Sequence, residues 1–317
     1  MDNQERPPFR DMQGLLNFAL RETAREDAEG QEALPMDPER RIWLEDALRN
    51  LSVDLVHELK RSLQLLNSDK CLDSNELPGE YEDALDSITD TVGSIDLAND
   101  FQKIGGLTLI PKCLDSPHPG IRWRTGHLIS TLTQNNPYCQ KQVVRANLVP
   151  TLLKMIEEDS DETVRVRCFS AISSIARGCQ EAQQELAKHD GFSVFLRTLQ
   201  SNSEKLKTKA AFLLTALCRD NLEFRDTLCK MGLAEQIIGL LYTDRDSTHE
   251  HLLSALLSLV RDHNPARIEC QRTNLGLRKI LVDKIEECKG QESLKEEEEY
   301  CKEILDLCFG DDLVEDR

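Results

Sequence analysis

The chain has 317 residues, a formal charge of −18 and 30 % charged residues, but only 5 % aromatic residues. This length allows a sizeable core, and the strong negative charge argues against a nucleic-acid-binding protein. The sequence contains neither an apolar run long enough for a transmembrane helix nor a secretory signal, so it predicts a cytosolic protein without a membrane segment. Its eleven scattered cysteines, without a CxxC pair, are expected to be reduced and mostly buried.

Residues 1–36 are expected to form a flexible segment with one short amphipathic helix. Between residues 9 and 24, Asp11 can cap a helix whose apolar residues recur on one face. The charged, proline-containing stretch that follows is typical of a linker. This helix is therefore predicted to be tethered to the folded body.

Residues 37–94 are predicted to form an N-terminal helical cap. Asp37 stands before Pro38, which suits an N-cap residue followed by the first position of a helix. Amphipathic patterns predict two further helices over residues 53–66 and 81–95. A stretch rich in turn-forming residues separates them.

A sequence repeat of about 42 residues follows the cap. The stretches IRWRTGHLIS, VRVRCFSAIS, LKTKAAFLLT and THEHLLSALL begin 43, 42 and 42 residues apart, each with a pair of basic residues or histidines before an apolar run. Upstream of each, residues that tolerate the left-handed helix-ending backbone recur at Gly106, Asn147, Gly191 and Gly232. Three helices per unit at this period are typical of armadillo repeats.

The sequence therefore predicts an all-α armadillo-repeat solenoid with helical caps at both ends. Four three-helix repeats are assigned to residues 95–264, and residues 265–317 to a C-terminal helical cap and acidic tail. Because the caps would close the open ends of the stack, a monomer is expected.

Basic residues recur on the third helix of each predicted unit, which lines the concave face of an armadillo solenoid. Residues 121–225 carry 15 Lys and Arg against 11 Asp and Glu, a net charge of +4 in a chain of −18. Charged helix pairs are often only solvated surface, but this local excess favours an acidic protein partner over a nucleic acid. We call the following residues the basic ladder: Arg124, His127, Arg167, Ser170, Lys209, Phe212 and His251.

Other kinds of site have little support. Armadillo proteins that clamp extended basic peptides carry repeated Trp and Asn on this helix, and those residues are absent here, so a folded surface is the expected ligand. Without a phosphate loop, zinc-protease motif or nucleophile elbow, no catalytic residue, metal site or cofactor is predicted. His249 and His251 lie two apart on a helix and point away from each other, which disfavours a shared metal ion.

Several stretches resemble one specific family. In chain order they are MQGLLNFAL, RRIWLEDAL, IRWRTGHLI, TVRVRCFSAISSI, DGFSVFLRTL, KLKTKAAFLL, HEHLLSALLSLV and YCKEILDLCF. Over nearly the whole chain they are similar to the armadillo-type nucleotide exchange factors of the 70-kilodalton heat-shock chaperone. This family includes the animal heat-shock-protein-binding proteins and the fungal Fes-type factors.

The resemblance implies a non-enzymatic co-chaperone. Its repeat body would bind the chaperone's nucleotide-binding domain and displace or distort one lobe, so that ADP escapes, and the contact surface would map onto the basic ladder. In Fes-type relatives an N-terminal segment is implied to release clients, and the chain begins almost at that segment, so roles of the longer leader of some animal relatives are not expected. The corresponding residues would be Met12, Gln13, Gly14, Leu15 and Leu16.

Two other functions stay open at the level of sequence. The repeat alone is also compatible with a non-catalytic armadillo scaffold for a different folded protein. An enzymatic function would depend on unassigned His and Glu groups such as His251. The collinear stretches and the basic ladder favour the exchange factor.

Overall fold

The structure is a computed structural model that describes residues 55–68 and 78–310. The helix predicted within residues 9–24 and the first helix of the N-terminal cap lie outside the described residues. The chain divides into Met1–Glu58 and Leu59–Arg317, and the second unit holds nearly all described residues. Every regular element in the described ranges is a helix, which confirms the all-α prediction. None of these helices has the length and hydropathy needed to span a membrane.

Within residues 55–68 and 78–94, two helices precede the repeats, α3 (Leu55–Leu66) and α4 (Gly79–Thr91). The prediction of one helix over residues 81–95 was wrong at its C-terminal end, because α4 ends at Thr91 and α5 begins at Ile95. Ser94 has an extended backbone between them, and its Oγ accepts a hydrogen bond from the backbone N–H of Leu97 at 3.3 Å. This N-cap starts α5 as a separate helix, whereas the apolar pattern alone predicted that the preceding helix would continue to residue 95.

From α5 onward, the helices follow a repeating order of first, second and third. The first helices are α5 (Ile95–Lys103), α8 (Pro137–Arg145), α11 (Gln180–Lys188), α14 (Leu222–Lys230) and α17 (Asn264–Cys270). The second helices are α6 (Ile110–Leu114), α9 (Leu148–Glu158), α12 (Gly191–Leu199), α15 (Leu233–Leu241) and α18 (Leu277–Cys288). The third helices are α7 (Pro119–Thr133), α10 (Glu162–Ala176), α13 (Glu204–Asp220), α16 (His249–Val260) and α19 (Lys295–Phe309). Short 3-10 helices precede α6, α18 and α19, namely η2 (Gly106–Leu109), η3 (Thr273–Leu275) and η4 (Glu292–Leu294).

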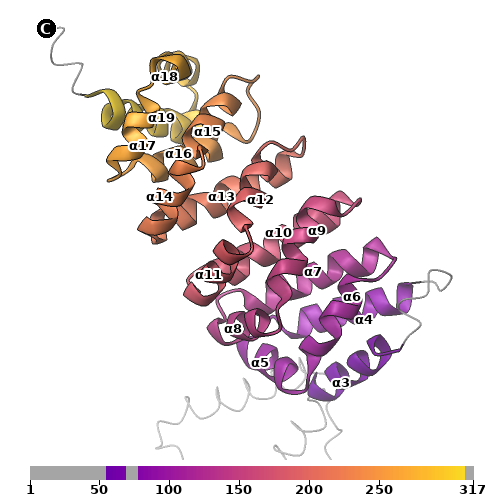
Figure 1. The fold of residues 1–317 in the computed structure, drawn as a ribbon. Helices are drawn as coiled ribbons and strands as arrows, with labels where there is room; N and C mark the ends of the chain where they lie inside the picture. Colours follow the sequence, from indigo (N-terminus) through magenta and orange to yellow (C-terminus); the bar gives the residue numbers. More distant parts are fainter. Residues whose placement is uncertain (1–54, 69–77, 311–317) are drawn as a thin grey trace, which may run out of the picture. The chain divides into compact units, whose positions relative to one another are not determined.

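The third helices pack on one another in chain order. Helix α4 contacts α7, and contacts continue from α7 to α10, α13, α16 and α19 (Figure 1). Helices α7 and α10 approach closely at Gly126, where a Cβ atom would lie only 3.2 Å from the backbone of Arg167 and Cys168. The small residue therefore brings the faces of two successive third helices together.

The turns between first and second helices correct one detail of the sequence analysis. The left-handed residues are Gly105 (φ 88°), Asn147 (φ 56°), Asp190 (φ 57°) and Gly232 (φ 81°), so the assignments to Gly106 and Gly191 were wrong by one position. Gly106 is small for a different reason, because a Cβ there would lie 2.4 Å from the Phe101 ring. At Asp190 the short polar side chain tolerates the left-handed backbone that Gly adopts elsewhere.

Helices α17–α19 repeat the arrangement of the preceding units. Gly276 has the same left-handed backbone (φ 59°) immediately before the second helix, α18. The side-chain amide of Gln271 donates to the carbonyl of Cys308 at 2.5 Å, just as Gln140 donates to the carbonyl of Arg177 at 2.9 Å. In both cases a residue of the first helix or its cap binds the end of the third helix 37 residues later. We therefore infer that part of the region assigned to a C-terminal cap is a fifth three-helix unit.

The described cysteines behave as small core residues. Nine of the ten cysteines in the described ranges are buried. Burial raises the pKa of the Cys168 and Cys218 thiols to about 12. The expectation of mostly buried thiols is confirmed within the described ranges.

Candidate functional site

Five of the seven basic-ladder residues lie around one cavity of about 450 Å³ on the third helices. Helix α7 contributes His127, α10 contributes Arg167 and Ser170, and α13 contributes Lys209 and Phe212. We call this cavity the cationic pocket. Its other lining residues are Ser130, Gln134, Asn135, Ser173, Ser174 and Arg177.

The local fold of α10 explains why these side chains face outward. Asp161 caps the helix by accepting a hydrogen bond from the backbone N–H of Val164 at 3.1 Å. The apolar stripe that includes Val164, Cys168 and Ile172 is fully buried. Residues on the opposite side of the helix, among them Arg167, are therefore left at the surface.

The cationic pocket carries positive charge that no carboxylate of the described chain neutralises. Arg167, Arg177 and Lys209 form no ion pair with any described Asp or Glu. Burial lowers the pKa of the Lys209 ammonium, and the nearby charges of Arg167 and Arg177 lower it further. Burial, followed by the charge of Arg167, also lowers the pKa of His127, so this imidazole is neutral near pH 7.

Aromatic and hydroxyl groups complete the surroundings of the pocket. The guanidinium of Arg167 lies 5.8 Å from the centroid of the Trp123 ring, within range of a cation–π contact. The hydroxyls of Ser130 and Ser174 lie 3.0 Å apart and link α7 to α10. Phe212 stands at the edge of the pocket with 48 % of its surface exposed. The pocket thus combines cations, hydroxyl groups and one exposed aromatic ring.

The two outer members of the basic ladder have different surroundings. Arg124 forms ion pairs with Asp86 at 2.8 Å and Glu82 at 3.1 Å, both on α4, so its charge is compensated within the chain. His251 lies beside Phe212, with ring centroids 4.4 Å apart. Neither residue lines the cationic pocket. Their role as contact residues stays a prediction.

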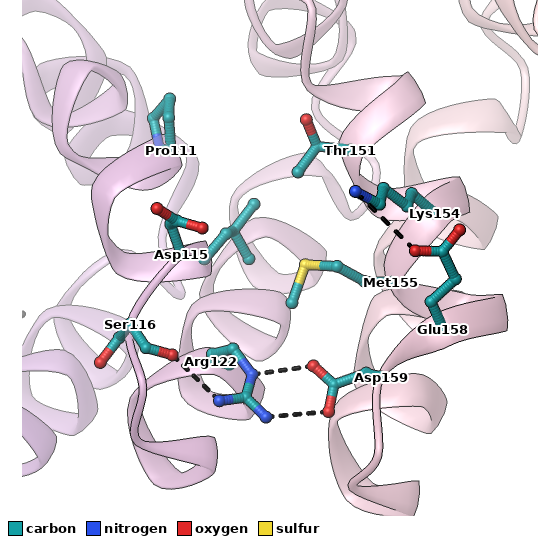
Figure 2. A pocket seen from close by; sticks show the side chains of 10 residues that line it. Pro111, Asp115, Ser116, Arg122, Thr151, Lys154, Met155, Glu158 and Asp159 are labelled. Atoms are coloured by element: carbon teal, nitrogen blue, oxygen red, sulfur yellow. Dashed lines mark hydrogen bonds and ion pairs between the residues drawn. The ribbon is translucent and has the colours of Figure 1, made fainter. Parts of the chain in front are cut away.

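A second cavity of about 550 Å³ lies between the α6–α7 region and α9, and four of its five charged residues are paired with one another. Figure 2 shows the guanidinium of Arg122 facing Asp159, with two hydrogen bonds of 2.8 and 2.9 Å, and donating to the carbonyl of Ser116. Burial opposes ionisation of Asp159, but the bonds from Arg122 and from a backbone N–H outweigh it and lower its pKa. Lys154 pairs with Glu158 on the same helix. The pair of Arg122 and Asp159 ties two units together, and both pairs leave less charge to bind a ligand.

The other positions considered in the sequence analysis are not part of the cationic pocket. Met12, Gln13, Gly14, Leu15 and Leu16 lie outside the described residues. His249 is buried, and its Nδ1 accepts a hydrogen bond from the Lys284 ammonium at 2.8 Å, away from His251. The two histidines therefore serve different parts of the fold.

Sequence reasoning missed Arg177, although a signal for it exists. The search used the basic pair at the start of each third helix, whereas Arg177 stands just after the end of α10. Its spacings of ten, seven and three residues from Arg167, Ser170 and Ser174 place it on the same helical stripe. Following that stripe to the helix end would have found it.

Comparison with known proteins places this geometry in a family. The family described as nucleotide exchange factor Fes1 matches residues 12–101, and the SIL1/FES1/HPBP1 C-terminal domain matches residues 97–221. Hsp70-binding protein 1 of Mus musculus is 35 % identical over 314 residues, which cover 96 % of this chain and 87 % of that protein. The Homo sapiens protein is 34 % identical with the same coverage. The Hsp70 nucleotide exchange factor FES1 of Coccidioides immitis (strain RS) is 28 % identical over 167 residues, 49 % of this chain and 76 % of its own.

Solved structures support the fold. A designed armadillo repeat protein in complex with peptide (KR)4 superposes with a TM-score of 0.66 at 19 % identity, covering 79 % of this chain and 99 % of its own. A computationally designed armadillo repeat protein for modular peptide recognition gives 0.65 at 19 % identity, covering 78 % and 99 %. The armadillo prediction is therefore confirmed. Together with the relatives that match nearly end to end, it shows that the chain belongs to the family of Hsp70-binding protein 1 and the Fes1-type nucleotide exchange factors.

Proposed function

We propose that this protein is a nucleotide exchange factor of Hsp70. It binds the chaperone's nucleotide-binding domain through the exposed face of its third helices and accelerates ADP release. The observation that carries the proposal is the match to Hsp70-binding protein 1 over 96 % of the chain, which includes every helix of the basic ladder. The unneutralised cations of the cationic pocket lie on the same face and favour an acidic protein surface as the ligand.

The mechanism needs binding energy and no covalent step. A protein that binds the opened, nucleotide-poor chaperone more tightly than the closed ADP state shifts the population toward the open state. Each 1.4 kcal/mol of that preference shifts the equilibrium about tenfold. Such a protein needs no catalytic residue or cofactor, and our proposal places it in the cytosol as a monomer.

The N-terminal segment has a separate role in this proposal. Residues 12–16 fall at the start of the region that matches the Fes1 family, and their apolar spacing suits docking as an amphipathic helix. We propose that this segment contacts the substrate-binding domain of Hsp70 and promotes release of clients. Deleting residues 1–36 should slow client release and leave ADP release unchanged.

The function is tested by stopped-flow release of a fluorescent ADP analogue from cytosolic Hsp70. The chain should accelerate release in a concentration-dependent manner that saturates. A triple variant with Arg124→Glu, Arg167→Glu and Lys209→Glu should accelerate it far less. If the unmodified chain gives no acceleration at any concentration, the protein is not an exchange factor for this chaperone, and an armadillo scaffold for another protein becomes the better assignment.

A further inference from the structure

Several cations of the third helices are matched by carboxylates of the chain itself. Arg122 is held by Asp159 at 2.8 Å, and Lys207 lies 3.7 Å from Asp246. Arg124 is matched by two acidic residues of α4, as described above. The cationic pocket instead gathers three cations without a carboxylate partner in the described chain, although the full chain carries 57 acidic residues against 39 Lys and Arg.

Three unmatched charges lie close together in the cationic pocket. Arg167 and Arg177 come from α10 and the residue that ends it, and Lys209 comes from the next third helix. They surround a single cavity, and their mutual repulsion adds to the cost of burying the Lys209 ammonium. A cluster of like charges that destabilises the free protein is typical of a site whose ligand carries the opposite charge.

The donors around the cavity fit a planar or tetrahedral oxyanion. The two guanidinium groups present forked N–H donors, and the ammonium of Lys209 adds a third positive group. Hydroxyl and amide groups supply further hydrogen bonds at the wall, from Ser130, Ser173, Ser174, Gln134 and Asn135. A carboxylate is the oxyanion that proteins present most readily.

We propose that the cationic pocket receives the carboxylate of an acidic side chain on the nucleotide-binding domain of Hsp70, an inference that rests on the proposed function. Arg167, Arg177 and Lys209 bind the carboxylate, and Phe212 packs against the apolar surface beside it. The cationic pocket is then the main binding point within the basic ladder, and Arg177 joins the contact residues.

A protein side chain suits the cavity better than a free anion. About 450 Å³ is far more space than one phosphate or sulfate ion fills, and it lies in the range of about 300–1,000 Å³ typical of larger ligands. The exposed ring of Phe212 on the rim offers apolar contact, which a small inorganic anion cannot use. A carboxylate carried on a folded surface uses both features.

The proposal predicts opposite effects of one substitution on binding and on stability. Lys209→Gln removes a positive group that the partner needs, so affinity for the nucleotide-free domain should fall about tenfold or more. The same change relieves repulsion from Arg167 and Arg177, so the melting temperature of the free protein should stay equal or rise. A residue with a merely structural role would lower both quantities.

The experiment measures binding of the full-length chain to the nucleotide-free domain together with the rate of ADP release. The pocket variants are Arg167→Gln, Arg177→Gln and Lys209→Gln. The control is Lys188→Gln on α11, which removes one positive charge from an exposed position paired only with Glu185. Each titration is made in sodium sulfate and in sodium chloride at equal ionic strength, because sulfate competes for an oxyanion site beyond general screening.

The expected result is weakened binding for the three pocket variants, near-unchanged binding for the control, and full acceleration once the variants are saturated. Sulfate should weaken binding by the unmodified chain more than chloride does, and Lys209→Gln should abolish that excess. If ADP release is accelerated but the pocket variants bind like the control, or sulfate acts no differently from chloride, the pocket proposal is wrong and the exchange function stands. If the unmodified chain neither binds nor accelerates release, both proposals are overturned.

Discussion

Phe212 on α13 stacks against His251 on α16, with ring centroids 4.4 Å apart and ring planes tilted by 37°. The contact joins the basic-ladder residues of two successive third helices. It also holds the Phe212 ring at the surface, although an apolar ring exposed to water is normally unfavourable. His251 covers one side of the ring, while 48 % of Phe212 stays exposed. The stacked pair therefore provides a preorganised apolar contact beside the cationic pocket.

The substitution Phe212→Ala is expected to weaken binding to Hsp70 by about 1–2 kcal/mol, or roughly 5- to 30-fold, because it removes an exposed aromatic anchor. Stability should change by less than about 1 kcal/mol, since nearly half of the ring already faces water. Titration of the nucleotide-binding domain and urea unfolding measure the two effects. Leu222→Ala on α14 is the control, because Leu222 is 66 % exposed but lies on a first helix. Equal binding losses in both variants would remove Phe212 from the contact surface.

Arg124→Gln should act mainly on stability. Its guanidinium joins α7 to Asp86 and Glu82 of α4, and its side chain is 18 % exposed, so the substitution leaves two carboxylates without their partner. We expect a loss of about 1–3 kcal/mol in the free energy of unfolding and a smaller loss of affinity than for Lys209→Gln. Comparing the two variants by urea unfolding and by binding tests this difference. A loss of affinity for Arg124→Gln larger than that for Lys209→Gln would show that its charge is available to the partner.

A buried ionic network connects α18 and α19 to the loop before α16. Glu297 accepts a hydrogen bond from Arg245 at 2.8 Å and lies 3.6 Å from Lys284, and both Glu297 and Lys284 are at most 5 % exposed. Glu297→Gln should therefore cost about 3–5 kcal/mol, because it leaves Lys284 as a buried charge without a carboxylate. Replacing Glu303 by Gln is the control, since its pair with Arg261 is exposed and should be worth less than about 1 kcal/mol. Similar losses of unfolding free energy in the two variants, measured by urea unfolding, would show that the buried network contributes no more than the exposed pair.

Stability should decrease as the pH falls below 6.5, partly because of His249. Burial, and then the charge of Lys284 and Arg245, lower its pKa in the folded state, against the opposing pull of Asp246 and Glu297. The unfolded chain, with the ordinary value of 6.5, therefore binds more protons than the folded chain just below that pH, and stability is lost as the pH falls.

Urea unfolding of the unmodified chain and of His249→Gln between about pH 7.5 and pH 5.5 checks this expectation. The variant should show a smaller decrease over that range. Because burial also lowers the pKa of His127, that residue contributes with the same sign, and His127→Gln separates the two contributions. An unchanged pH dependence in His249→Gln would exclude His249 as a cause.

Gly106→Ala should destabilise the protein by about 1–3 kcal/mol, because its new methyl group would lie 2.4 Å from the Phe101 ring. Gly239→Ala is the matched control on α15, where nothing lies within 4 Å of the added Cβ. That substitution should stabilise the protein by up to about 1 kcal/mol, since Ala favours a helix more than Gly does. Thermal unfolding of both variants measures the two effects. Destabilisation by Gly239→Ala would contradict the open space around that residue.

The sequence predicted the order of the helices and much of the surface because both follow from a repeat. Arg124, Arg167, Lys209 and His251 recur at a fixed spacing, so their shared helix face could be inferred without coordinates. The ends of elements depended on single side chains, such as the cap at Ser94, which periodicity does not report. The inferred fifth unit lacks the basic pair of the repeat, because α19 begins with one lysine followed by four glutamates.

The cationic pocket shows a second limit of sequence reasoning. Pairing between helices decides which cations are neutralised, and this pairing is a property of the packed structure. Arg124 and Arg167 look equivalent in the repeat, yet only Arg124 has carboxylates of α4 beside it. Arg177 lies outside the basic pairs of the repeat, and although the helical stripe of α10 extends to it, only the packed structure shows that it lies near Lys209.

The serial packing of the third helices has a thermodynamic consequence. Because each third helix packs against the third helices of the neighbouring units, cooperativity passes between nearest neighbours, as in a one-dimensional chain of coupled units. Unfolding of α19 can then begin at its end of the stack while α10 and α13 stay folded. Amide hydrogen exchange should accordingly show protection that falls off toward α19, and a partner bound at α10 and α13 should slow exchange most in the two adjoining layers.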